Sequence, residues 1–241
     1  MAAKKIAWIT GGGTGIGLGG AKVLASEGWT VVISGRRADV LNQVAKDLGG
    51  NVEAVALDVG DAAKVEQAAA SILQKHGRID LLVNSAGLNI TNRSWADLTT
   101  QAWDQVVDIN LNGLMYCIRA VLPAMRAQKS GTIVNVSSWA GKLPSKVTGP
   151  AYSATKHAVV ALTHSFNQEE FRNGLRASAL CPGEVATDIM KKRPVPPTAE
   201  DMARMLQIED LGRTIAFVAN MPPHVCMNEI LISPVWNRSF V

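Results

Sequence analysis

A tyrosine and a lysine four residues apart carry the first sign of chemistry in this sequence. In the segment AYSATKHAVVALTHSF, Tyr152 and Lys156 fall within a helical pattern, so their side chains share one helix face. A free phenol has a pKa of about 10 and is a poor acid at neutral pH, but a neighbouring ammonium favours the phenolate and lowers that pKa. We therefore expect Tyr152 to exchange a proton with a carbonyl or alcohol oxygen, and Ser138 to hydrogen-bond the same oxygen. Tyrosine and lysine also occur at this spacing on ordinary helix surfaces, so the meaning of the pair depends on the elements around it.

A glycine-rich segment near the start of the chain predicts a phosphate site. The residues TGGGTGIG, Thr10 to Gly17, follow the apolar run KIAWI and precede the helical pattern LGGAKVLASEG. A strand that leads into a helix in this way aims free N–H groups and the positive end of the helix dipole at one point, which suits an anion. The glycines Gly11, Gly15 and Gly17 are spaced G-x-x-x-G-x-G, and no Gly-Lys-Ser/Thr follows, which excludes a nucleoside triphosphatase loop. A plain glycine-rich turn is the alternative.

The fold that must position these residues is predicted from alternating strand and helix patterns. Runs rich in Val, Ile, Leu and Ala are expected to be parallel strands buried on both faces, at residues 5–10, 30–35, 52–59, 80–87, 131–138, 175–183 and 229–234. Helical patterns separate them, and Gly28, Gly77 and Gly131 suit helix C-termini. We expect one α/β domain over residues 1–241, a doubly wound, mainly parallel seven-stranded Rossmann-type sheet with helices on both faces. The strands would then end along one edge, where ligands bind.

Composition and charge exclude several classes of protein. The 241 residues are 47% hydrophobic and 18% charged, which fits a compact folded chain. No apolar stretch reaches the length of a membrane span, and MAAKK runs directly into the first strand, so we expect a cytoplasmic protein without a membrane partner. The net charge of +4 is scattered apart from GRR and KKR, so we expect no nucleic-acid partner. The four histidines and three cysteines show no metal-ligand spacing, and we predict no metal site.

Taken together, these motifs resemble the short-chain dehydrogenase/reductase family over essentially the whole chain. The glycine segment matches the family pattern T-G-x-x-x-G-x-G, and NSAG at 84–87 is similar to N-N-A-G, with Ser85 in place of the second Asn. LDV carries the expected adenine contacts, and PGEVAT is similar to the segment that binds the nicotinamide carboxamide. By this resemblance the cofactor-binding residues are Gly11, Thr14, Gly15, Ile16, Gly17, Arg36, Arg37, Asp58, Val59, Asn84, Ala86, Gly87, Tyr152, Lys156, Pro182, Gly183, Val185 and Thr187.

The same resemblance implies a catalytic set of Asn110, Ser138, Tyr152 and Lys156. It implies a carbonyl and a secondary alcohol interconverted by hydride transfer, with Tyr152 as acid and base and Lys156 bound to the nicotinamide ribose. The interval from Ser138 to Tyr152 is about one residue longer than usual, which leaves a choice between Ser137 and Ser138; Gly141 matches S-x-x-G and favours Ser138. The alternative function is a cofactor-binding sensor or structural homologue without turnover, in which the tyrosine or lysine is often lost.

The end of the second strand predicts the cofactor. NAD-preferring proteins carry an acid there for the ribose hydroxyls. Here Gly35 is followed by Arg36 and Arg37, and a guanidinium can bind the 2′-phosphate through charge-assisted contacts. We therefore predict NADP(H), with Arg36 as the main contact. Two solvated arginines at a helix start are the alternative.

Three loops are expected to form the substrate pocket by resemblance: residues 88–95, 139–150 and 184–205. They contain Arg93, Trp95, Trp139, Lys142, Lys146, Lys191, Lys192 and Arg193. This lining could attract an anionic substrate such as a keto or hydroxy acid, or its charges could simply be solvated. The C-terminal ISPVWNRSFV lacks the usual Gly-Gly ending and is similar to the branch that acts on serine and related 3-hydroxy acids. Resemblance also implies a homotetramer.

Overall fold

Seven parallel strands form one sheet in the computed structural model, which describes residues 4–237. In spatial order they run β3-β2-β1-β4-β5-β6-β7, and every neighbouring pair is parallel. The strands are β1 Ile6–Thr10, β2 Thr30–Gly35, β3 Val52–Ala56, β4 Leu81–Asn84, β5 Gly131–Val136, β6 Leu175–Pro182 and β7 Glu229–Ile232. The strand order reverses direction between β1 and β4, which in a doubly wound sheet is where a ligand binds.

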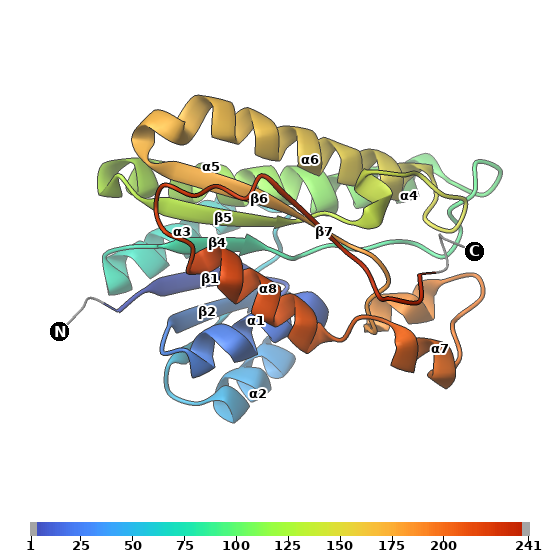
Figure 1. Ribbon diagram of the computed structural model, residues 1–241, viewed down its shortest axis with the longest axis horizontal. Helices are drawn as coiled ribbons and strands as arrows, with labels where there is room; N and C mark the ends of the chain where they lie inside the picture. Colours follow the sequence, from blue (N-terminus) through green and yellow to red (C-terminus); the bar gives the residue numbers. More distant parts are fainter. Residues whose placement is uncertain (1–3, 238–241) are drawn as a thin grey trace.

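Helices cover both faces of the sheet, as the sequence predicts. They are α1 Gly15–Ser26, α2 Ala38–Leu48, α3 Ala62–His76, α4 Thr100–Val107, α5 Gly113–Gln128, α6 Pro150–Glu170, α7 Ala199–Arg204 and α8 Ile208–Ala219. Short helical turns cover Asp108–Asn112, Trp139–Gly141, Phe171–Asn173 and Asp188–Lys192. Figure 1 shows α5 and α6 on one side of the sheet and α1, α2 and α8 on the other. Among the residues described, none of the helices combines the length and apolar character that crossing a bilayer requires.

Two apolar cores, one on each face, follow from the alternation of side chains along the strands. Ile9 of β1 packs with Leu24 of α1 and Ile215 of α8. Its neighbour Trp8 packs on the opposite face with Val121 of α5, and its indole Nε1 donates to Ser34 Oγ at 2.8 Å. Both residues of β1 are fully buried, which explains why the run KIAWI shows no polar alternation.

One expected helix end is wrong. Gly77 ends α3 with φ +74°, and Gly28 follows α1 with φ +85°, as predicted. After α5, however, Lys129 takes the left-handed conformation with φ +54°, and Gly131 is the first residue of β5. The glycine is needed there for space, because a Cβ at position 131 would lie 2.5 Å from Met125 Sδ.

The contact between α1 and α8 depends on two glycines. A Cβ on Gly19 would lie 2.0 Å from the carbonyl oxygen of Ile208, and one on Gly212 would lie 2.3 Å from the carbonyl oxygen of Gly19. The two helices therefore approach main chain to main chain. Alanine would favour the helix by about 1 kcal/mol, but it cannot fit without displacing backbone.

We expect Gly19→Ala to lower the free energy of unfolding by about 2 kcal/mol, because overpacking of this size outweighs the gain in helix propensity. Urea denaturation measures the change. Gly50→Ala is the matched control, because nothing lies within 4 Å of a Cβ at that exposed position. Equal stability of Gly19→Ala and the wild type would contradict the close contact.

Candidate active site

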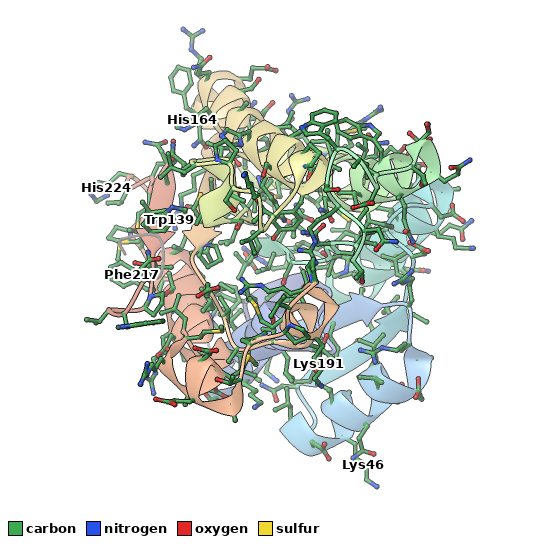
Figure 2. All side chains as sticks on the ribbon, turned by 90° about the vertical axis from the view of Figure 1, so that its right-hand side faces the viewer. Lys46, Trp139, His164, Lys191, Phe217 and His224 are labelled. Carbon is green, nitrogen blue, oxygen red and sulfur yellow. The ribbon has the colours of Figure 1, made fainter. Side chains whose placement is uncertain are left out.

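The carboxyl ends of the strands bring most of the expected residues to one edge of the molecule. Figure 2 faces this edge, with Trp139 and Lys191 from two of the expected pocket loops on it. The glycine loop lies against the segment after β4: a Cβ on Gly11 would be 2.9 Å from both Ser85 O and Ala86 N. The amide of Ala86 also donates to Thr10 Oγ1 at 3.2 Å. The loop is thus fixed to the sheet before any ligand is present.

The glycines of this loop serve the chain itself as well as a ligand. Gly11 and Gly15 have φ values of +66° and +55°, which other residues rarely adopt. A Cβ on Gly17 would lie 2.4 Å from Gly11 O, so the first turn of α1 packs on the loop that precedes it. Ile16 packs against the core, and Thr14 occupies the N-cap position of α1 without a side-chain capping bond. The N–H groups of this turn remain a suitable place for phosphate oxygens.

Lys156 is buried beneath this edge, with 5% of its surface exposed. Its Nζ donates to the carbonyl oxygen of Val136 at 2.8 Å and lies 5.5 Å from the centre of the Tyr152 ring. A Cβ on Gly87 would be 3.7 Å from Lys156 Nζ and 3.4 Å from Asn110 Oδ1. Three expected site residues, from the loop after β4, the α4–α5 segment and α6, are therefore neighbours.

Asn110 lies in a π-helical turn, Asp108–Asn112, between α4 and α5. Its side-chain amide accepts from the amide of Leu88 at 2.8 Å and donates to the carbonyl of Leu88 at 2.9 Å. Asn110 is therefore a clamp on the loop that follows Gly87. Helical periodicity did not predict the π turn, which often marks a functional position.

The structure distinguishes the two adjacent serines. Ser137 is 2% exposed, and its hydroxyl donates to the carbonyl of Lys156 at 2.8 Å. The Ser138 hydroxyl instead accepts from the amide of Ala140 at 3.1 Å, and it is one of the groups that lower the pKa of Tyr152. Gly141 permits this arrangement, because a Cβ there would lie 2.5 Å from Ser137 Oγ and 2.6 Å from Lys156 O.

The expected effect of the lysine on the tyrosine is corrected by the structure. Desolvation raises the pKa of Tyr152, and the groups that oppose it are the Ser138 hydroxyl and the charges of Arg93 and Arg193. Desolvation also lowers the pKa of Lys156 to about 8, so its ammonium loses its proton at a lower pH than an exposed lysine does. Burial thus outweighs the pairing that the i, i+4 spacing predicts.

Arg36 lies beside a cavity of about 600 Å³. The cavity is lined by Arg36, Asp58, Gly60, Asp61, Lys64, Gln101, Asp104, Gln105, Asp108 and Ile109. Lys64 is bound to Asp61 at 3.0 Å, and Asp58 accepts from the amide of Gly60 at 3.0 Å. Val59 is buried against Gly113. Arg37 does not line the cavity, and its charge helps to lower the pKa of Asp188. Arg36 and Asp58 therefore share this cavity, and Arg37 is directed elsewhere.

The segment after β6 also lies at the edge where the strands end. Pro182 ends β6, and the amide of Gly183 donates to Ile232 O at 2.7 Å. Val185 is buried and forms a parallel bridge with Leu206. Thr187 approaches the glycine loop, because a Cβ on Gly15 would lie 3.3 Å from Thr187 Cγ2.

Two arrangements near the site were not predicted from the sequence. Asn84, which the family motif marks, donates to Asn135 Oδ1 at 2.9 Å, and Asn135 donates to Thr163 Oγ1 of α6 at 3.0 Å. Arg193 Nη1 donates to Glu184 Oε1 at 2.6 Å. The only sequence signal for the Asn84–Asn135–Thr163 hydrogen bonds is a polar residue inside an otherwise apolar strand, such as Asn135 in GTIVNV. Among the residues described, no three His, Cys, Asp or Glu side chains are grouped to hold a metal.

Comparison with known proteins identifies the family. Residues 5–196 match the family described as short chain dehydrogenase. An uncharacterized oxidoreductase of Staphylococcus epidermidis is 32% identical over 232 residues, which cover 96% of this chain and 98% of that protein. This chain belongs to the short-chain dehydrogenase family.

Solved structures with the same fold carry nicotinamide cofactors. The closed form of serine dehydrogenase complexed with NADP+ superposes with a TM-score of 0.89 at 30% identity and covers 95% of each chain. The 3-ketoacyl-(acyl-carrier-protein) reductase from Brucella melitensis complexed with NADH has a TM-score of 0.88 at 29% identity, over 95% of this chain and 96% of that one. This chain is therefore an oxidoreductase of that family with the Rossmann-type fold.

The buried Lys156 gives a pH-dependent stability. Its folded pKa of about 8 lies below the ordinary value of 10.5, so between these values the unfolded chain retains a proton that the folded protein has lost. Stability rises with pH where the unfolded state binds more protons. We expect the free energy of unfolding of wild type, minus that of Lys156→Met, to increase from pH 8 to pH 10, as measured by urea denaturation without cofactor. Parallel curves would contradict a desolvated ammonium.

Proposed function

We propose that this protein is an NADP(H)-dependent oxidoreductase that interconverts a carbonyl and a secondary alcohol. The observation that carries the proposal is the grouping of Tyr152 with the buried Lys156, whose Nζ lies 5.5 Å from the centre of the Tyr152 ring, and with Ser138, whose hydroxyl lowers the pKa of Tyr152. Ser138 ends the segment after β5, whereas both other residues lie in the first two turns of α6. In the proposed site, one substrate oxygen contacts the hydroxyls of both Ser138 and Tyr152.

In the proposed mechanism the Ser138 hydroxyl orients the carbonyl oxygen and Tyr152 donates its proton to it. The raised pKa of Tyr152 keeps the phenol protonated at neutral pH, which is the form that reduction requires. Lys156 binds the nicotinamide ribose and, with Arg93 and Arg193, stabilises the phenolate that remains. Asn110 holds the loop after Gly87 against the site through both of its bonds to Leu88. Bound NADPH supplies the hydride for the carbonyl carbon.

The residues present suit a dinucleotide. Gly11 and Gly15 have positive φ and lack side chains in the turn before α1, so a pyrophosphate could approach the backbone N–H groups there. Asp58 and Arg36 lie on one cavity, so an adenosine there has the arginine within reach of its ribose. No acid follows β2 to bind ribose hydroxyls, since Gly35 precedes Arg36 and Arg37. This arrangement supports NADP(H), and one related structure contains NADP+.

The homotetramer and the cytoplasmic location remain predictions. An assembly is supported by two apolar side chains of α8 and β7, Phe217 and Leu231, which are each more than half exposed (Figure 2 labels Phe217). A non-catalytic cofactor-binding homologue is the alternative, and turnover distinguishes it from the enzyme.

Replacement of Tyr152 by Phe removes the proton donor and keeps the ring. We expect kcat for carbonyl reduction to fall by about 1,000-fold, in the range that general acid catalysis contributes, while fluorescence titration shows unchanged NADPH binding. Tyr116→Phe is the matched control, since the other tyrosine of the chain packs against the core on α5. Full turnover by Tyr152→Phe would overturn the mechanism.

Replacement of Arg36 by Ala tests the cofactor. The loss of a charge-assisted contact to the 2′-phosphate should weaken NADPH binding by about 10- to 100-fold and leave NADH binding unchanged. Titration of both cofactors measures the ratio of the two dissociation constants. Arg172→Ala is the control, because this exposed arginine precedes β6 at the opposite edge of the sheet. An unchanged ratio in Arg36→Ala would reject the assignment of NADP(H) to this residue.

A further inference from the structure

The basic side chains of the three pocket loops do not share one environment. Lys142 and Lys191 each pair with an acidic side chain at 2.6 Å. Lys146 is exposed, and the side chain of Lys192 lies outside the described part of the chain. Arg93 differs from these lysines because it is only 7% exposed and is bound to the main chain of a neighbouring loop.

Two buried polar side chains join the loop after β4 to the segment before α6. Asn89 and Arg93 are 6% and 7% exposed, although amide and guanidinium groups are mostly found at the surface. Asn89 Nδ2 donates to the carbonyl of Thr148 at 3.0 Å, and Arg93 Nη1 donates to the carbonyl of Val147 at 3.1 Å. Two consecutive carbonyls of one loop are therefore held by two side chains of another.

Main-chain packing continues this junction at the next residue. Gly149 has a φ of +75°, and a Cβ there would lie 2.5 Å from Arg93 O and 2.9 Å from Arg93 Cβ. Gly149 is also the N-cap of α6, and Pro150 is the first residue of that helix. Tyr152 is its third residue, so the turn that carries the phenol begins directly on the contact with Arg93.

The loop after β4 is itself fixed by Asn110. Asn110 binds both the amide and the carbonyl of Leu88, the residue before Asn89. Its Nδ2 also donates to Thr155 Oγ1 at 3.4 Å, and that hydroxyl donates to the carbonyl of Tyr152 at 2.9 Å. The first turn of α6 is thus held before its start by the loop after β4 and again through Thr155, and both connections lead to Asn110.

The polar character of this junction suits a role in alignment. Burial lowers the pKa of Arg93, which reflects the cost of placing a guanidinium there. Apolar side chains could join two loops without that cost, but a hydrogen bond also restricts distance and angle. Alignment matters at Tyr152, because a displacement of about 1 Å at a reacting group can cost about 100-fold in rate.

We propose that Asn89 and Arg93 are positioning residues for Tyr152, which hold the start of α6 so that the phenol stays aligned with the substrate oxygen. This inference rests on the proposed function, because the group that they position is the proton donor of that reaction. They act through the carbonyls of Thr148 and Val147. The glycine loop is joined to other residues, at 85–86, so cofactor binding should not depend on this junction.

The first test measures kcat for the carbonyl compound that the wild type reduces fastest among aldehydes, ketones and keto esters. Asn89→Leu and Arg93→Met should each lower kcat about 10-fold and leave the Kd of NADPH within about threefold. Because Asn89 is uncharged, an equal loss in both variants points to position and not to charge. Arg93→Lys, which retains a donor for the carbonyl of Val147, should recover most of kcat. Asn51→Leu is the matched control, since it removes two amide bonds to main-chain carbonyls before β3, at the opposite edge of the sheet.

A double-mutant cycle separates positioning of the phenol from general support of the fold. In Tyr152→Phe, Asn89→Leu and Arg93→Met should each lower the residual rate by less than about twofold, because the group that they position is absent. A further 10-fold loss in that background, or unchanged kcat in both single variants, would overturn the inference and leave the proposed function intact.

Hydrogen exchange tests the junction without turnover. The amides of residues 153–156 should exchange at least about 10-fold faster in Asn89→Leu and Arg93→Met than in the wild type, as measured by mass spectrometry. Unchanged exchange would overturn the inference. Faster exchange in a protein that reduces no carbonyl would keep the junction as the support of α6 and reject the proposed function. Circular dichroism checks each fold; if Arg93→Met does not fold, Asn89→Leu and its cycle with Tyr152→Phe decide.

Discussion

Close contact between main-chain segments, possible only where a side chain is absent, holds this site together. At Gly141 the segment after β5 meets the carbonyl of Lys156 so closely that a Cβ would lie 2.6 Å from it. Gly11 similarly meets Ser85 and Ala86, and Gly149 meets Arg93. Each contact joins a loop at the edge of the sheet to the element that carries a functional side chain. Their positions are thereby determined by backbone packing, which is stiffer than contacts between flexible side chains.

The second constraint is electrostatic. A buried ammonium and a buried guanidinium are both costly, and this protein buries one of each, at Lys156 and Arg93. Lys156 is held by the carbonyl of Val136 and has a lowered pKa, whereas Arg93 keeps its charge because guanidinium is so basic. The permanent positive charge near Tyr152 therefore comes from the arginines.

The buried amides explain how the two halves of the site keep their alignment. Asn84 of β4, Asn135 of β5 and Thr163 of α6 form a chain of hydrogen bonds across the sheet to the helix of Tyr152 and Lys156. Asn110, in the π turn, similarly holds the loop after β4 through its hydrogen bond with the amide of Leu88. Each hydrogen bond of the Asn84–Asn135–Thr163 chain requires one relative placement of strand and helix, although Asn84 Oδ1 itself is buried without a partner.

The sequence by itself determined the order of strands and helices, the parallel sheet and the edge at which ligands bind. The reason is that continuous apolar runs such as KIAWI and TVVISG, separated by helical patterns, leave few topologies that bury both faces. Sequence motifs also pointed to four candidate site residues, Gly11, Asn110, Tyr152 and Lys156. Each motif is short, so its spacing can be recognised from the sequence without the structure. The motif S-x-x-G favours Ser138 over Ser137, but the effect of Ser138 on the pKa of Tyr152 acts across 14 positions of the sequence and depends on the fold.

Only the tertiary structure decided the charges and the fine geometry. Spacing predicts that Lys156 lowers the pKa of Tyr152, whereas burial of both groups, which no local pattern reports, reverses that effect. The end of α5 also depends on the tertiary structure. Lys129, not Gly131, takes the left-handed conformation there, and Gly131 packs against Met125 two residues later. The sequence does not tell which basic residues of the pocket loops are buried, and folding buries Arg93 and most of the Arg193 side chain. Desolvation and electrostatic fields depend on every neighbour in three dimensions, so they arise only when the loops from distant parts of the chain meet.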